Sequence, residues 1–211
     1  MNYIYLHGFC SGENSYKGSF FRERFAAEKG LQLHTPDLNG NDFEHLTMTG
    51  QLAIVRKLID SLDGDIVMMG SSMGGYLSTL LAEDIPRIKK MVIIAPAFQF
   101  AARYLKRMDE RILESWRDEG YIEVYHHAYQ ENRRLHYGIL EDARQYDQRI
   151  LQREMPALIF HGIDDESVSY QLSIDYLDQN PEAQVMLLKS DHAMVDQSNN
   201  MWQHIQNWLN I

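Results

Sequence analysis

The segment 70–74, Gly-Ser-Ser-Met-Gly, is the part of the sequence whose residue types and spacing point most clearly to chemistry. It fits the pattern G-x-S-x-G, in which a serine is held on a tight turn between a strand and a helix. An apolar run over Asp65–Met69 precedes the segment and a helical pattern follows it. We therefore predict that Ser72 is a nucleophile and Ser71 a packing residue; a glycine-rich turn without chemistry is the alternative.

Backbone N–H groups near this serine are expected to stabilise an oxyanion. Met73 begins the helix after the turn, where the helix N-terminus favours negative charge. The first apolar run ends in His7-Gly8-Phe9, and Gly8 lets the backbone approach a substrate closely. We predict that Phe9 and Met73 supply the oxyanion donors and that His7 belongs to the scaffold.

A serine hydroxyl is a weak nucleophile and needs a base that is oriented by an acid. In the fold that carries this type of turn, the chain order is serine, acid, histidine. Three histidines follow residue 160: His161, His192 and His204. His192 lies in a polar loop between a predicted strand and a predicted helix, from which it can reach Ser72. We predict His192 as the base, with a solvated loop histidine as the alternative.

The acid should follow the apolar run Ala157–Phe160. Three carboxylates compete at this place: Asp164, Asp165 and Glu166. We predict Asp165, because Gly162 turns the chain ahead of it and Val168 can anchor the far side of the loop. Asp164 is the first alternative.

Short apolar runs alternate with helical patterns along the chain. Most of the runs are continuous, as expected of strands buried on both faces of a parallel sheet. They are Tyr3–Leu6, Leu31–His34, Ile66–Met69, Met91–Ala95, Ala157–Phe160 and Val185–Leu188. This order predicts a single α/β domain over residues 1–211, with a mostly parallel six-stranded sheet and helices on both faces. Together with the serine turn at 70–74, it predicts the α/β-hydrolase fold.

Residues 98–150 separate two predicted strands by more than a simple crossover needs, and we interpret them as a helical cap or lid. A helical stripe from Ala101 to Trp116 is expected to stop near Gly120. Further along, the sequence predicts a strand over Tyr121–His127, a polar turn at Glu131–Arg134 and a helix over Glu141–Leu151.

The cap segment is rich in aromatic residues, which are common in the linings of small-molecule sites. We expect it to line an acyl pocket, with Tyr104 and Trp116 as substrate-binding residues. The alternative is that these rings only hold the cap on the sheet.

Composition and charge make several partners and locations poor candidates. The 211 residues carry a formal net charge of −10, so nucleic acid and anionic membranes are poor partners. No apolar run reaches the roughly 18 residues of a membrane span, and the start MNYIYLHGF lacks the pattern of a signal peptide. Cys10 is the single cysteine, which favours a cytoplasmic location. The histidines at 126, 127 and 136 lack a metal-ligand spacing, so we expect no metal.

In chain order, the motifs resemble those of the YqiA/YcfP-like esterases, small bacterial α/β hydrolases. The stretches that carry the resemblance are 5–9, 36–38, 70–75, 95–97, Gly162 with Asp165, and 191–192. The resemblance implies the nucleophile Ser72, the acid Asp165, the base His192 and the oxyanion donors Phe9 and Met73.

The resemblance also implies an esterase that needs no cofactor and prefers short acyl chains. The expected partner is a small-molecule acyl ester or thioester, and the protein is expected to be a monomer or homodimer. A peptidase or amidase with the same triad is an alternative, and so is a binding module of this fold without catalysis. The cap segment 98–150 is longer than in the smallest relatives, which leaves substrate size open.

Overall fold

A parallel sheet of six strands forms the centre of the protein in the computed structural model, which describes residues 1–28 and 30–211. In sheet order the strands are β2 (Leu33–His34), β1 (Asn2–Leu6), β3 (Ile66–Ser71), β4 (Ile88–Ile94), β7 (Ala157–Gly162) and β8 (Ala183–Leu188). Every residue of β3 and β7 is buried, as expected for central strands covered on both faces. The predicted six-stranded sheet is confirmed.

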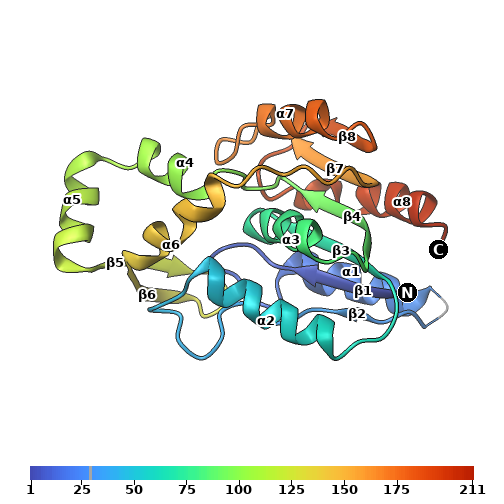
Figure 1. Ribbon diagram of the computed structural model, residues 1–211, viewed down its shortest axis with the longest axis horizontal. Helices are drawn as coiled ribbons and strands as arrows, with labels where there is room; N and C mark the ends of the chain where they lie inside the picture. Colours follow the sequence, from blue (N-terminus) through green and yellow to red (C-terminus); the bar gives the residue numbers. More distant parts are fainter. Residues whose placement is uncertain (29) are drawn as a thin grey trace.

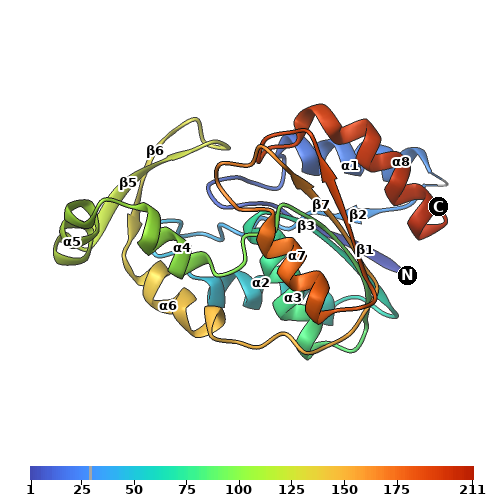
Figure 2. The ribbon, with the colours of Figure 1, turned by 90° about the horizontal axis from the view of Figure 1, so that it is seen from above.

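Helices cover both faces of this sheet, as Figure 2 shows. On one face lie α1 (Tyr16–Ala27) and α8 (Ser198–Leu209); on the other lie α2 (Met48–Asp60), α3 (Met73–Asp84) and α7 (Gln171–Gln179). Alternate side chains of β1 divide between the two cores, with Tyr3 and Tyr5 in one and Ile4 and Leu6 in the other. None of the helices in the described residues combines the length and hydropathy that a membrane crossing requires.

The cap segment 98–150 runs between β4 and β7 and lies beyond the carboxyl ends of the strands (Figure 1). It contains α4 (Phe100–Arg107), α5 (Glu110–Glu119), β5 (Tyr121–His126), β6 (Glu131–His136) and α6 (Gly138–Asp147). The residues of the expected helical stripe, Ala101 to Trp116, form two helices instead of one. The break lies at Asp109, whose side chain accepts a hydrogen bond from the Arg111 N–H and caps the start of α5. As predicted, that helix ends at Gly120, which has a positive φ of 84°.

A β-hairpin in the cap corrects a second expectation. Residues 131–134 were expected to form a turn but belong to β6, which pairs antiparallel with β5, and the turn lies at 127–130. The polar residues of this strand are compatible with pairing because only Leu135 of β6 is buried. The hairpin contacts the loop after β1: the His127 N–H donates a hydrogen bond to the Cys10 carbonyl oxygen at 2.9 Å.

Candidate active site

Ser72 occupies a strained turn between β3 and α3. Its φ of 54° and ψ of −118° are unusual for a residue with a side chain. Three backbone hydrogen bonds hold the turn: the Ser72 N–H donates to the Ile94 carbonyl, and the Tyr76 and Ala97 N–H groups donate to the Ser72 carbonyl, all at 2.9–3.1 Å. The backbone of Ser72 is thus fixed by residues of α3, of β4 and of the segment after β4.

Two glycines let this turn pass close to other backbone segments. A Cβ on Gly70 would lie 2.3 Å from the Gly74 carbonyl oxygen, and a Cβ on Gly74 would lie 2.1 Å from the Leu6 carbonyl oxygen. Neither position can hold a larger residue without a shift of the backbone. The need for tiny neighbours around the serine, inferred from the motif, therefore has a direct steric cause.

Gly74→Ala is expected to lower the free energy of unfolding by about 3 kcal/mol or more, because the methyl group meets the backbone of β1. Urea denaturation followed by circular dichroism measures the change. Gly75→Ala is the matched control, since its Cβ would lie 3.3 Å from the nearest atom and a small shift relieves the contact. Equal stability of the two variants would contradict this account of the turn.

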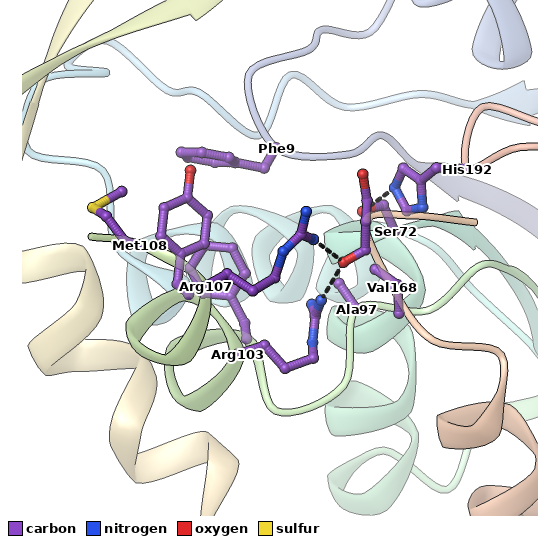
Figure 3. A pocket seen from close by; sticks show the side chains of 11 residues that line it. Phe9, Ser72, Ala97, Arg103, Arg107, Met108, Val168 and His192 are labelled. Carbon is purple, nitrogen blue, oxygen red and sulfur yellow. Dashed lines mark hydrogen bonds between the residues drawn. The ribbon is translucent and has the colours of Figure 1, made fainter. Parts of the chain in front are cut away.

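A chain of hydrogen bonds joins the three residues predicted to act together. His192 Nε2 lies 3.0 Å from Ser72 Oγ, and His192 Nδ1 lies 2.6 Å from Asp165 Oδ2. An ionised carboxylate only accepts, so Nδ1 donates to Asp165 and Nε2 is left to accept the Ser72 hydroxyl proton. The residues follow β3, β7 and β8, whose carboxyl ends meet at one edge of the sheet. Figure 3 shows the contact between Ser72 and His192.

The carboxylate of Asp165 is fully buried and has several donors. Its Oδ1 accepts from the Ser167 and Val168 N–H groups, each at 2.8 Å. Burial would raise the pKa of Asp165, but hydrogen bonds from His161 and His192 and from the backbone outweigh it and hold that pKa well below its usual range. The group is therefore an anion at neutral pH.

His161 is a contributor to this site that the sequence did not reveal. It is the penultimate residue of β7 and is completely buried. Its Nε2 lies 3.2 Å from Asp165 Oδ2 and 3.0 Å from the Val168 carbonyl oxygen, both of which only accept. Nε2 therefore carries the proton, and the Ser173 hydroxyl donates to Nδ1 at 2.7 Å. The available sequence signal was its spacing of four residues from Asp165.

The competing carboxylates point elsewhere. Asp164 is exposed and forms an ion pair with Lys189, with Nζ 3.0 Å from Oδ1. Glu166 is exposed as well. The geometry thus favours Asp165 as the partner of His192.

The backbone N–H groups of Phe9 and Met73 are the two predicted oxyanion donors. Within the described residues, neither the Phe9 nor the Met73 backbone N–H donates to another protein group. The loop that carries Phe9 is held by His7, whose Nε2 accepts from the Leu38 N–H at 2.9 Å while Nδ1 donates to the Gly8 carbonyl at 2.9 Å. His7 therefore has the scaffold position that the sequence predicted, and two free donors remain beside the serine.

A cavity of about 440 Å³, here called the cap-side cavity, lies between Ser72 and the cap. Its lining residues are Phe9, Ser72, Ala97, Phe100, Arg103, Tyr104, Arg107, Met108, Ser167, Val168 and His192 (Figure 3). Tyr104 lines the cavity as predicted. The structure corrects the expectation for Trp116, which lies outside this set: it is buried behind Tyr104, and its indole N–H donates to the Leu135 carbonyl at 2.9 Å. Trp116 therefore packs the interior of the cap.

A second cavity of about 420 Å³ meets the same two side chains from another direction. Ser72 and His192 line it together with Ser15, Lys17 and His127. Lys17 Nζ donates to the Ala193 carbonyl at 2.6 Å, next to His192. Ser72 and His192 thus border two cavities.

Solved structures with the same fold cover almost the whole chain. Alpha/beta hydrolase domain-containing protein 10 from mouse has a TM-score of 0.83 at 21% identity, covering 99% of this chain and 89% of that protein. Est1E from Butyrivibrio proteoclasticus, solved with ferulic acid, has a TM-score of 0.76 at 18% identity, covering 100% and 90%. A thermophilic esterase from Thermogutta terrifontis, solved with malate, has a TM-score of 0.67 at 18% identity, covering 100% and 89%. These similarities establish the α/β-hydrolase fold.

Sequence comparison places the chain in a family. No curated protein matches the sequence significantly. Residues 2–208, however, match the family model described as Uncharacterised protein family (UPF0227). Because that match spans nearly the entire sequence, the chain belongs to UPF0227, the YqiA/YcfP family that its motifs resemble.

Proposed function

We propose that this protein is a serine hydrolase that cleaves carboxylic esters, thioesters included, through an acyl-enzyme on Ser72. The observation that carries the proposal is the hydrogen-bonded chain from Ser72 through His192 to Asp165. In this chain Ser72 lies on a strained turn, and Ser72 and His192 line a cavity. The combination of nucleophile, base and orienting acid is the arrangement that acyl transfer requires.

The geometry suggests how each group acts. Ser72 Oγ attacks the substrate carbonyl carbon while its proton passes to His192 Nε2, and Asp165 stabilises the imidazolium. The Phe9 and Met73 N–H groups donate to the oxyanion of the tetrahedral intermediate. As this intermediate collapses, the bond to the alcohol or thiol breaks and His192 gives its proton to the leaving group. Water then attacks the acyl-enzyme with His192 again as the base, which releases the acid and restores Ser72.

Labelling with a fluorophosphonate probe tests the proposal, because this reagent reacts with an activated serine. Wild-type protein should be labelled at Ser72, as located by peptide mass spectrometry, and Ser72→Ala should not be labelled. A folded wild-type protein that resists the probe would favour a binding module without catalysis. Turnover of matched ester, thioester and amide substrates then separates an esterase from a peptidase or amidase.

Tyr104→Ala is expected to shift the preferred acyl-chain length upward, because removing its ring enlarges the cavity beside Ser72. The change in kcat/KM along a series of chromogenic esters should exceed the change in thermal stability. Tyr125→Ala is the control, since Tyr125 is 52% exposed on the hairpin and does not line this cavity. An unchanged chain-length profile in Tyr104→Ala would show that the cap does not select the acyl group.

A further inference from the structure

Two arginines of α4 project into the cavity beside Ser72. Arg103 and Arg107 lie one helical turn apart, and both line the space between the aromatic residues of the cap and the Ser72–His192 pair (Figure 3). Each donates a hydrogen bond from Nη1 to the same atom, the carbonyl oxygen of Ser167. The shared acceptor brings the two guanidinium groups close together.

The two guanidinium groups form no ion pair with a carboxylate of the described residues. Six other arginines pair with carboxylates: Arg56 and Arg149 with Asp84, Arg111 with Asp109, Arg117 with Asp118, Arg133 with Glu131, and Arg134 with Glu44. Arginines such as Arg22 and Arg153 instead donate to neutral oxygens outside the cavity. Across residues 1–28 and 30–211, neither Arg103 nor Arg107 has such a partner, although the chain has a net charge of −10. Burial and the neighbouring charge of Arg107 lower the pKa of Arg103, and the charges of Asp147 and Asp165 oppose this shift without forming an ion pair with it. The pair is thus a local site of positive charge without a direct carboxylate partner.

Both side chains retain donors for a ligand. A guanidinium group has five N–H donors arranged to bind a carboxylate through two parallel hydrogen bonds. Arg103 uses Nε for the Phe98 carbonyl, at 2.7 Å, and Nη1 for Ser167, whereas Arg107 uses only Nη1. The remaining N–H groups can therefore bind an anion in the cavity without breaking the contacts to Ser167.

We propose that Arg103 and Arg107 form an anion-binding subsite for the acyl part of the substrate. The preferred substrates would then be monoesters of dicarboxylic acids, whose free carboxylate binds the arginines while the ester carbonyl lies at Ser72. This inference rests on the proposed hydrolase function and on the assignment of the cap-side cavity to the acyl group. It adds a charge requirement to a pocket that otherwise selects by size and apolar contact.

A matched pair of substrates tests the subsite. The 1-naphthyl monoester of adipic acid carries the free carboxylate, and the analogue whose far carboxyl is a primary amide has nearly the same shape without the charge. In wild-type protein at low ionic strength, kcat/KM for the acid should exceed that for the amide by about tenfold or more. Added salt should reduce the ratio, because Arg107 is exposed and its charge is screened.

Arg107→Gln should lower the acid-to-amide ratio by about tenfold, and Arg107→Lys should restore part of it. Lys106→Gln is the control, because it removes the same charge from the residue that precedes Arg107 in α4. Lys106 is exposed and does not line the cavity, so the ratio should stay at the wild-type value. Equal kcat/KM for acid and amide in wild type would overturn the inference. Equal losses on both substrates in Arg107→Gln would also overturn it, because the arginine would then only hold the Asp165 loop.

A binding measurement separates this inference from the proposed function. Calorimetric titration of the Ser72→Ala protein with adipate requires no catalysis. Binding that is lost in the Ser72→Ala, Arg107→Gln double variant would support the subsite even if no ester were hydrolysed. Hydrolysis of the neutral ester with no adipate binding and no charge preference would retain the hydrolase and reject the subsite.

Discussion

Replacing Ser72 with alanine is expected to lower kcat by at least about a thousandfold while the protein stays folded. The hydroxyl is the group from which His192 Nε2 can accept a proton, at 3.0 Å, and an alanine methyl cannot attack a carbonyl. The fold should tolerate the change, because the hydrogen bonds that hold the turn at residue 72 come from its backbone. Steady-state kinetics on a short-chain chromogenic ester, with circular dichroism of the same sample, measures both effects.

Ser71→Ala is the control for this experiment. Ser71 is the last residue of β3 and is buried at 4% exposure; it borders the second cavity but not the cap-side cavity, and no hydrogen bond joins it to His192. Its loss should leave kcat within a few fold of wild type. If Ser71→Ala were inactive and Ser72→Ala retained turnover, the nucleophile would have to be reassigned.

Asp165→Asn is expected to lower kcat by about four orders of magnitude. The amide nitrogen of asparagine can donate to His192 Nδ1, which moves the imidazole proton to Nε2 and leaves that atom unable to accept from Ser72. The asparagine oxygen can still accept from the Ser167 and Val168 N–H groups. The His161 Nε2–H loses its acceptor on residue 165 but keeps the Val168 carbonyl oxygen at 3.0 Å, so the loop should keep its shape. Kinetics at saturating substrate, with a thermal melt to verify folding, tests the expectation.

Asp164→Asn is the matched control, since it neutralises the adjacent carboxylate. That side chain forms an exposed ion pair with Lys189, a kind of contact that contributes little to stability. Its kcat should therefore remain close to wild type. An active Asp165→Asn protein together with an inactive Asp164→Asn protein would reverse the assignment of the acid.

The parts of the protein that could be predicted from sequence depend on local constraints. Gly70, Ser72 and Gly74 follow a strand and precede a helix, and sterics allow few ways to make that turn. The loop positions of Asp165 and His192 follow from the order of strands in a parallel sheet, whose carboxyl ends share one edge. Strand boundaries were less accurate: β3 extends through Gly70 and Ser71 because they still pair with β4, although neither is apolar.

The parts that could not be predicted depend on contacts between distant segments. Arg103 and Arg107 are polar residues of an amphipathic helix, and the sequence pattern alone would put them in solvent. They face the cavity because α4 lies against the loop of Ser167, a tertiary contact across about 60 residues. The same limit applies to Trp116, whose aromatic character fits a pocket lining and a packed interior equally well.

The cap segment leaves the sheet after β4 and returns at β7, and these two strands are direct neighbours, with Met91 opposite Ala157. A segment whose two ends are held side by side can change in length at low cost, since each doubling of a loop adds only about 0.6 kcal/mol of closure entropy. Evolution could therefore exchange or extend this segment without disturbing the strands that carry Ser72, Asp165 and His192. A change in the length or sequence of the cap would then alter the cavity without moving the edge of the sheet that holds these three side chains.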